Sequence, residues 1–309
     1  MNKPLRITIF GTGGIGGFLA ARLCSIGTSS VTVTCIARGE HRDAVSQNGL
    51  KFIDPEGEET IVKPHLCTDN PADASDTDLW ILCTKGYDLD DVSKALSPLV
   101  KEDTVILPLL NGADIYQRMR RHIAAGIILP GCIFISSTVT EPGTVKHIGG
   151  AGAVTAGYDP SRKDYDPEGL IKLFDEAKIP FTWQDDPLPA VWKKYLFIAP
   201  LSLVTAVTEK TFSEVLSDSK LVKDVRAIME EIISLARTQG VELESSLMDE
   251  HLTQAAAFPP ETKTSFQRDV ESGSGRDERD ILGGAIIRMG DDLGIEVPTA
   301  TKYYLQLPR

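Results

Sequence analysis

The sequence predicts a two-domain α/β protein, with alternating strands and helices over residues 1–185 and an all-helical domain over residues 186–309. Two observations carry this prediction. Strand and helix signals alternate through the first part of the chain, and only helical periodicity follows from about residue 187. The length of 309 residues agrees with it, because a domain has on average about 150 residues. Such alternation favours a mostly parallel sheet covered by helices.

The segment RITIFGTGGIGG, residues 6–17, places a short apolar strand directly before glycines spaced G-x-G-x-x-G. Gly11 would let the chain turn tightly, Gly13 would let the backbone approach a pyrophosphate, and Gly16 would let the following helix pack close to the sheet. A tight turn with no ligand is the alternative, but the apolar-periodic stretch ending at Gly27 supplies the expected helix. The motif therefore predicts a Rossmann-type dinucleotide-binding domain. Its loop residues assigned to the cofactor are Gly11, Thr12, Gly13, Gly14, Ile15 and Gly16.

The second predicted strand, residues 31–37, is followed by Arg38. An acidic residue here would hold the ribose 2′-hydroxyl of NAD, whereas an arginine accommodates the 2′-phosphate of NADP. Arg42 could add a second cation, while Glu40 is an acid nearby, and a solvated loop arginine is the alternative reading of Arg38. The sequence favours NADP(H) as the cofactor.

The remaining elements follow from apolar patterning and turn residues. A hairpin is expected over 50–54 and 59–63, turning at 55–57. Further strands are expected over residues 79–83, 105–112, 132–140 and 152–158. Helices are expected over residues 188–208, 219–239 and 278–293, and loops over 159–169 and 296–309. The apolar stripe of 219–239 fits a core helix or a dimer interface, so a homodimer stays open.

Composition excludes several classes of partner. The net charge of −12 disfavours binding to nucleic acid, because phosphate backbones would be repelled. The five cysteines have no C-x-x-C spacing and read as reduced core residues, so no metal site is predicted. No apolar run approaches the roughly 18 residues of a membrane span, and the chain enters a strand without a signal-peptide core. We expect a cytoplasmic protein.

Further motifs follow along the chain. They are TKGYD at 84–88, LLNG at 109–112, KHIGGAG at 146–152, WKKYLF at 192–197, KTSFQRDVE at 263–271 and RDERD at 276–280. Together with the glycine loop and ARG after the second strand, this order resembles the ketopantoate reductase (2-dehydropantoate 2-reductase) family over essentially the whole chain. The resemblance implies NADPH-dependent reduction of a 2-oxo acid to a 2-hydroxy acid, in a cleft between the two domains. The default substrate that the resemblance implies is 2-dehydropantoate, which is reduced to pantoate in pantothenate biosynthesis.

Lys194 lies in a largely apolar stretch, where a cation is costly unless it faces a polar group. Reduction of a ketone requires a proton at the carbonyl oxygen, and a protonated lysine can supply it as a general acid. The resemblance implies that Lys194 is the catalytic lysine. Lys193 points about 100° away around a helix and is expected to be solvated. Snorkelling of Lys194 is the alternative.

Two residues of the first domain are assigned by the resemblance together with their positions. Asn111 follows a strand at the edge where open α/β sheets bind ligands, and the family has an asparagine there near the nicotinamide and the substrate. An ordinary Asn-Gly turn with Gly112 is the alternative. Lys85 matches a family lysine near the cofactor and the substrate, although a solvated loop cation would look the same.

The substrate residues implied by the resemblance are Glu278, at the hydroxyl end of the substrate and near the cofactor, and Ser265, near its carboxylate. The spacing between them is one residue longer than the usual pattern, so Asp277 could take the role of the glutamate. A charged helix N-terminus would explain both acids with no ligand.

The chain departs from the family at positions that matter for substrate recognition. Ile198 and Ser202 stand where the family usually has asparagines, and a further asparagine would fall near Phe212. Ser202 is kept as a substrate-binding candidate. Losing amides removes hydrogen-bonding capacity from the pocket, so a less polar 2-oxo acid is the alternative substrate. A nucleotide-binding regulatory protein without turnover is the alternative of another class, and the retained Lys194 and Glu278 argue against it.

Overall fold

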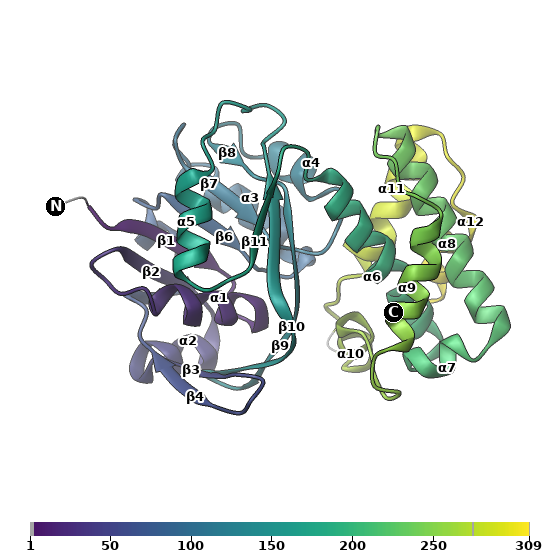
Figure 1. Ribbon diagram of the computed structural model, residues 1–309, viewed down its shortest axis with the longest axis horizontal. Helices are drawn as coiled ribbons and strands as arrows, with labels where there is room; N and C mark the ends of the chain where they lie inside the picture. The colour runs from purple at the N-terminus through teal and green to yellow at the C-terminus, as the bar shows by residue number, and fades with distance from the viewer. Residues whose placement is uncertain (1–2, 274, 309) are drawn as a thin grey trace. The chain divides into compact units, whose positions relative to one another are not determined.

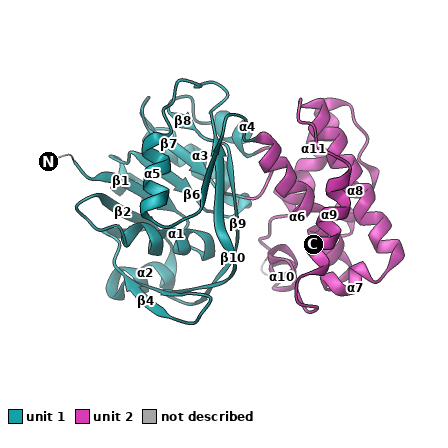
Figure 2. Ribbon diagram, in the orientation of Figure 1, with its two compact units in different colours: residues 1–110, 115–187 teal, residues 111–114, 188–309 magenta. Residues whose placement is uncertain are grey.

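The computed structural model describes residues 3–273 and 275–308. They divide into two compact units (Figure 2). Unit 1 comprises Met1–Leu110 and Ile115–Pro187, and unit 2 comprises Asn111–Asp114 and Leu188–Arg309. Unit 1 combines strands with helices, whereas the elements of unit 2 are helical (Figure 1). The predicted fold class is confirmed.

A parallel sheet forms the centre of unit 1. Within the described residues its strands run in the order β5-β2-β1-β6-β7-β8. Their bounds are β1 Leu5–Phe10, β2 Val31–Ile36, β5 Leu66–Thr68, β6 Leu79–Leu82, β7 Val105–Pro108 and β8 Ile127–Ile128. Because β1 pairs in parallel with both β2 and β6, the glycine loop, Arg38 and the TKGYD segment all leave the sheet at one edge.

A second, mixed sheet follows the order β11-β10-β3-β4, with β9 paired to β10. Its strands are β3 Leu50–Ile53, β4 Glu59–Val62, β9 Gly131–Glu141, β10 Thr144–Gly157 and β11 Phe181–Gln184. The predicted hairpin is confirmed as the antiparallel pair β3 and β4. The sequence pattern predicts one sheet and does not reveal this second one, because the partner of a strand depends on packing with residues far away in the chain.

Helix α1, Gly14–Cys24, packs against strands of both sheets. A Cβ atom on Gly14 would overlap the carbonyl oxygen of Ser137 in β9, and one on Gly17 would lie 2.5 Å from Cγ2 of Val145 in β10. Small residues on this face therefore allow the helix to approach the second sheet. The helix ends at Cys24, before the predicted end at Gly27, whose φ of +99° lies in the following turn.

Shorter helices complete unit 1. They are α2 Gly39–Asn48, α3 Leu89–Leu96, α4 Ile115–Arg120 and α5 Glu168–Glu176, with 3-10 turns η1 Pro71–Ala74 and η2 Gly86–Asp88. Leu89, Val92 and Leu96 of α3 are buried at helical spacing, so this helix presents one apolar face to the protein.

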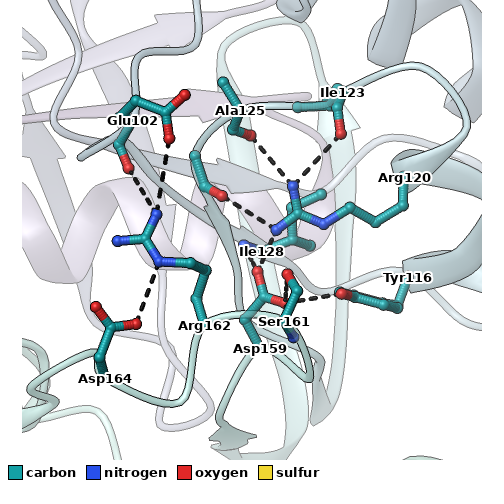
Figure 3. A network of polar contacts seen from close by, with 11 residues as sticks. Glu102, Tyr116, Arg120, Ile123, Ala125, Ile128, Asp159, Ser161, Arg162 and Asp164 are labelled. Atoms are coloured by element: carbon teal, nitrogen blue, oxygen red, sulfur yellow. Dashed lines mark hydrogen bonds and ion pairs between the residues drawn. The ribbon is translucent and has the colours of Figure 1, made fainter.

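A buried carboxylate joins α4 to β8 and to the loop after β10 (Figure 3). Asp159 is fully buried and accepts hydrogen bonds from the Tyr116 hydroxyl at 2.7 Å, the Ile128 N–H at 2.8 Å and the Ser161 N–H at 2.9 Å. It also forms an ion pair with Arg120. Burial alone would raise the pKa of Asp159, but the hydrogen bonds from Ser161, Tyr116 and Ile128 hold that pKa below its ordinary value.

The helices of unit 2 surround α6, Leu188–Thr208, which spans the predicted range. The others are α7 Phe212–Leu216, α8 Ser219–Thr238, α9 Ser246–Ala256, α10 Ser265–Glu271, the π-helical turn η3 Asp280–Gly284, α11 Ala285–Leu293 and α12 Pro298–Gln306. The prediction of a loop over 296–309 was wrong. Pro298 occupies the first turn of α12, where a proline is compatible with a helix, and Ala300 and Tyr303 bury one face.

The two long helices of unit 2 are core elements. Among the described residues, α6 alone is long and apolar enough to cross a membrane, contrary to the expectation that no run approaches this length, but 78% of its apolar window is buried inside the protein. Leu221, Val225 and Ile228 of α8 are also buried, and α8 packs against α6, α11 and α12. The apolar stripe of α8 is therefore used within the chain itself.

Candidate active site

The glycine loop has the backbone geometry that its sequence predicts. Gly11 has a φ of +91°, and a Cβ atom there would lie 2.9 Å from the backbone of Cys83, so the position requires glycine. A Cβ atom on Gly16 would overlap the carbonyl oxygen of Gly11, which accounts for close packing of the helix against the strand. Thr12 is buried and its hydroxyl donates to the carbonyl of Ile36 at 3.1 Å. The loop is thus held to β2.

The N-terminus of α1 provides a setting for an anion. A Cβ atom on Gly13 would meet nothing within 4 Å among the described atoms, so space is open in front of the helix. In the described chain the first turn, which contains Gly14 and the half-buried Ile15, has no acidic residue and no side-chain cap. The buried hydroxyl oxygen of Thr84, next to Gly11, has no hydrogen-bond partner within the described chain. Open space, a positive helix end and an unused hydroxyl fit the pyrophosphate of a dinucleotide.

Arg38 precedes α2 as its N-cap residue, and its side chain is 63% exposed. Its Nη1 atom lies 3.5 Å from Oδ2 of Asp88, whose side chain is only 18% exposed. Arg42 instead pairs with Asp43 and, at 2.5 Å, with Asp69. Arg42 is therefore less suited to act as the second cation. No sequence motif points to Asp88 as the partner of Arg38, because only the strand order places TKGYD beside it.

Lys85 is half-buried and directly precedes the turn η2. Its carbonyl oxygen accepts a hydrogen bond from the Asp88 N–H at 3.0 Å. It follows β6, the neighbour of β1, so it leaves the sheet at the same edge as the glycine loop.

The two adjacent lysines of α6 differ in their surroundings. Lys194 is 7% exposed, whereas the side chain of Lys193 is 50% exposed and lies 4.0 Å from Glu250. Tyr195, next along the helix, donates its hydroxyl to the carbonyl oxygens of Ile281 at 2.9 Å and Leu282 at 3.1 Å. Burial raises the pKa of Tyr195, which keeps this hydroxyl a neutral donor. The helix that carries Lys194 is thereby fixed to η3.

Asp277 and Glu278 are both buried just before η3. The Asp277 carboxylate accepts hydrogen bonds from the N–H of Arg279 at 3.0 Å, from its Nε at 2.8 Å and from its Nη2 at 2.6 Å. Burial raises the pKa of Asp277, but these bonds outweigh that effect and lower it. The pairing with Arg279 therefore accounts for the buried Asp277 carboxylate without a ligand.

Asn111 belongs to unit 2 together with Lys194 and Glu278. It is half-buried, and Gly112, with a φ of +139°, completes the Asn-Gly turn. Asp114 lies 3.2 Å from Nη2 of Arg288, which also pairs with Asp280. This arginine therefore connects the segment that carries Asn111 to the turn that follows Glu278.

The positions of the missing amides are largely apolar. Ile198 is half-buried, and Ser202 is buried one turn further along α6. Phe212 is buried in an edge-to-face contact with Phe258, at 5.7 Å between ring centroids. Ser265, the first residue of α10, is exposed, unlike the buried Lys194, Ser202 and Glu278.

The cysteines and acids give no sign of a metal centre. Among residues 3–273 and 275–308, no group of three or more His, Cys, Asp or Glu side chains is arranged to hold a metal ion. The five cysteines are free thiols, and burial raises the pKa of Cys24 and Cys67 to about 11. Cys24 and Cys67 are therefore neutral thiols at physiological pH.

Comparison with known proteins identifies the family. The family model described as ketopantoate reductase PanE/ApbA matches residues 7–161, and the model of its C-terminal part matches residues 186–307. A 2-dehydropantoate 2-reductase of Halobacterium salinarum is 27% identical over 294 residues, which cover 95% of each chain.

Solved structures agree with this result. A 2-dehydropantoate 2-reductase of Geobacter metallireducens matches with a TM-score of 0.84 and 27% identity, over 98% of this chain and 99% of that one. D-mandelate dehydrogenase, solved with NADH and anilino(oxo)acetate, has the same fold at a TM-score of 0.87 and 22% identity, over 98% and 97% of the two chains. The chain is thus an oxidoreductase that belongs to the ketopantoate reductase family.

Proposed function

We propose that this chain reduces a 2-oxo acid to a 2-hydroxy acid with NADPH, and that its substrate is 2-dehydropantoate, which yields pantoate for pantothenate biosynthesis. The observation that carries the proposal is the burial of Lys194 on α6 in a chain that matches the family along both of its parts. A cytoplasmic location is part of the proposal, supported by five free and largely buried cysteines, as expected in a reducing compartment.

The cofactor would be held by unit 1. The backbone of Gly13 and the N-terminus of α1 would bind the pyrophosphate, and the exposed guanidinium of Arg38 is available to the 2′-phosphate. Lys85, at the same edge of the sheet, would add a cation near the cofactor. The bound nicotinamide supplies the hydride that the carbonyl carbon of the substrate accepts.

The proton would come from unit 2. In this proposal Nζ of Lys194 donates a proton to the carbonyl oxygen as that oxygen gains negative charge, and the amine is reprotonated from solvent. Lys193 is exposed and close to Glu250, so it is a poor candidate for this step. Glu278 would accept a hydrogen bond from the hydroxyl of ketopantoate, with Asn111, Ser202 and Ser265 as further polar contacts.

A less polar 2-oxo acid is the second candidate substrate, favoured by Ile198 and by the packing of Phe212 on Phe258. These side chains offer apolar surface where an amide would offer hydrogen bonds. The general acid and the cofactor residues would be the same for both candidate substrates. The two proposals therefore differ only in which side chains of the substrate pocket contact the 2-oxo acid.

Turnover with a panel of substrates tests the proposal. NADPH oxidation is followed with ketopantoate, with aliphatic 2-oxo acids and with an aromatic 2-oxo acid, using Lys194→Ala as the inactive control. We expect ketopantoate to give the highest kcat/KM. A higher kcat/KM for an apolar 2-oxo acid would favour the second candidate substrate. NADPH binding without turnover of any 2-oxo acid would contradict the proposed reductase activity and support a regulatory protein.

The choice of cofactor is tested separately by binding. Replacing Arg38 by alanine removes a charge-assisted contact worth about 1.5–3 kcal/mol, or roughly tenfold to over a hundredfold in NADPH affinity. The affinity for NADH should change little. Equal affinities of the unmodified protein for the two cofactors would contradict this assignment.

A further inference from the structure

An ion pair crosses the sheet edge where the glycine loop begins. Arg38 follows β2 and Asp88 follows β6, and β1 lies between these two strands. Their side chains meet at 3.5 Å between Nη1 and Oδ2. Since β1 continues into Gly11, the strands that carry the two residues flank the strand that leads into the proposed cofactor loop, and the two charged groups meet beyond the end of β1. The acid is largely covered and the arginine is largely exposed, so the acid is the more fixed partner.

Asp88 stands at the start of α3, but its carboxylate does not cap that helix. It makes no side-chain capping hydrogen bond within the part of the chain that the structure describes. The first turn of α3 already contains Asp90 and Asp91, which interact favourably with the helix dipole. A neutral side chain at position 88 would therefore change the charge that faces Arg38 and keep Asp90 and Asp91 at the helix start.

Resting on the proposed role of Arg38, we propose that Asp88 is a specificity-determining residue that reduces the preference for NADPH over NADH. Its carboxylate competes with a 2′-phosphate for Arg38 and repels that phosphate, which carries a charge of about −1.5 to −2 at neutral pH. With NADH, the same carboxylate would accept a hydrogen bond from the ribose 2′-hydroxyl, as an acidic residue does in NAD-binding Rossmann domains. Arg38 and Asp88 thus act in opposite directions on cofactor choice.

The second arginine of this region does not remove the competition. Arg42 is engaged by Asp43 and Asp69, so it is not free to replace Arg38 when Asp88 holds it. The pair of Arg38 and Asp88 is therefore an adjustable contact at this edge.

The test is a double-mutant cycle on the full-length protein. Dissociation constants for NADPH and NADH are measured by fluorescence titration for the unmodified protein, Arg38→Ala, Asp88→Asn and the double variant. Asp88→Asn should tighten NADPH binding roughly tenfold, the effect of removing one like charge at close range, and should leave NADH binding unchanged or slightly weaker. The gain should shrink as salt is added.

Asp91→Asn is the matched control, because it removes the same charge from α3 at a side chain that is 85% exposed and lies near Lys94. It should change both affinities less than twofold, roughly the level expected of a screened surface charge. Thermal unfolding checks that each variant is folded, and Asp88→Ser gives a second neutral variant if the asparagine is unstable.

The outcomes separate the two proposals. If Arg38→Ala leaves the NADPH to NADH ratio unchanged, the proposed reading of Arg38 is wrong and the role of Asp88 is wrong with it. If Arg38→Ala weakens NADPH binding while both neutral variants at position 88 leave the ratio unchanged, Arg38 retains its role and the proposal for Asp88 is overturned.

Discussion

Replacement of Asp159 by alanine should destabilise unit 1 strongly. The carboxylate is fully buried, and its partners are the Arg120 guanidinium, the Tyr116 hydroxyl and the N–H groups of Ile128 and Ser161 (Figure 3). Removing one partner of a buried ion pair costs about 3–5 kcal/mol, because the remaining charge is left uncompensated. We expect the lower part of this range, since Arg120 would still donate to the carbonyls of Ala125 and Gly126 at 3.2 and 3.0 Å.

The assay is urea denaturation followed by circular dichroism, with Asp164→Ala as the matched control. Asp164 lies on the same loop, but its side chain is 74% exposed, so its removal should have little effect. If Asp159→Ala lowers the unfolding free energy no more than Asp164→Ala does, the buried carboxylate does not stabilise unit 1.

The loss of unfolding free energy caused by Asp159→Ala should also depend on pH. Because the folded state lowers the pKa of Asp159, the carboxylate stabilises the fold above its ordinary pKa near 4, and this contribution is lost as the pH falls through the lower folded value. The difference in unfolding free energy between the unmodified protein and Asp159→Ala should therefore stay constant from about pH 5 to 8 and shrink below about pH 4, close to the ordinary aspartate pKa. A difference that grows toward acid would contradict the assigned sign.

Three further predictions concern the site and unit 2. Lys194→Ala should lower kcat by about 10² to 10⁴ with little change in NADPH affinity, while Lys193→Ala should do much less; equal, small effects in steady-state kinetics would show that the proton comes from elsewhere. Gly13→Val should abolish binding of both cofactors in titrations without lowering the melting temperature, because its side chain enters open space, whereas Gly14→Ala should unfold more easily because it would overlap Ser137. The Nε2 of His251 donates to the Lys193 carbonyl at 3.1 Å, and burial lowers the pKa of this imidazole. The neutral His251 therefore stabilises the fold above its ordinary pKa near 6.5, and this stabilisation is lost as the pH falls through the lower folded pKa. His251→Gln should make the stability of the protein less sensitive to pH below about 6.5, and an unchanged pH profile would argue against this assignment.

Much of the candidate site could be predicted because its signals are local. The turn at Gly11, the position of Arg38 after β2 and the range of α6 each depend on residues close together in the sequence. The distinction between Lys193 and Lys194 also follows from helical geometry, which turns neighbouring side chains about 100° apart. The structure buries only the second of these lysines.

Other features could not be predicted, because they depend on which distant segments meet. The range 296–309 looked like a loop, and only burial of Ala300 and Tyr303 in unit 2 accounts for the helix α12. Likewise, the chemical alternatives Asp277 and Glu278 are neighbours with the same charge. Only the folded structure shows that Arg279 binds Asp277.

The sequence by itself determined the family, the strand-turn-helix at the glycine loop, the β3–β4 hairpin and the helical character of unit 2, because hydrophobic periodicity and turn residues act over a few neighbouring positions. Only the tertiary structure decided that β9 and β10 join the hairpin in a second sheet, that Gly14 and Gly17 are needed for α1 to approach it, and that Asp88 faces Arg38. These are contacts between segments far apart in the chain, and their partners are selected by packing and charge in the folded state, which no local pattern records.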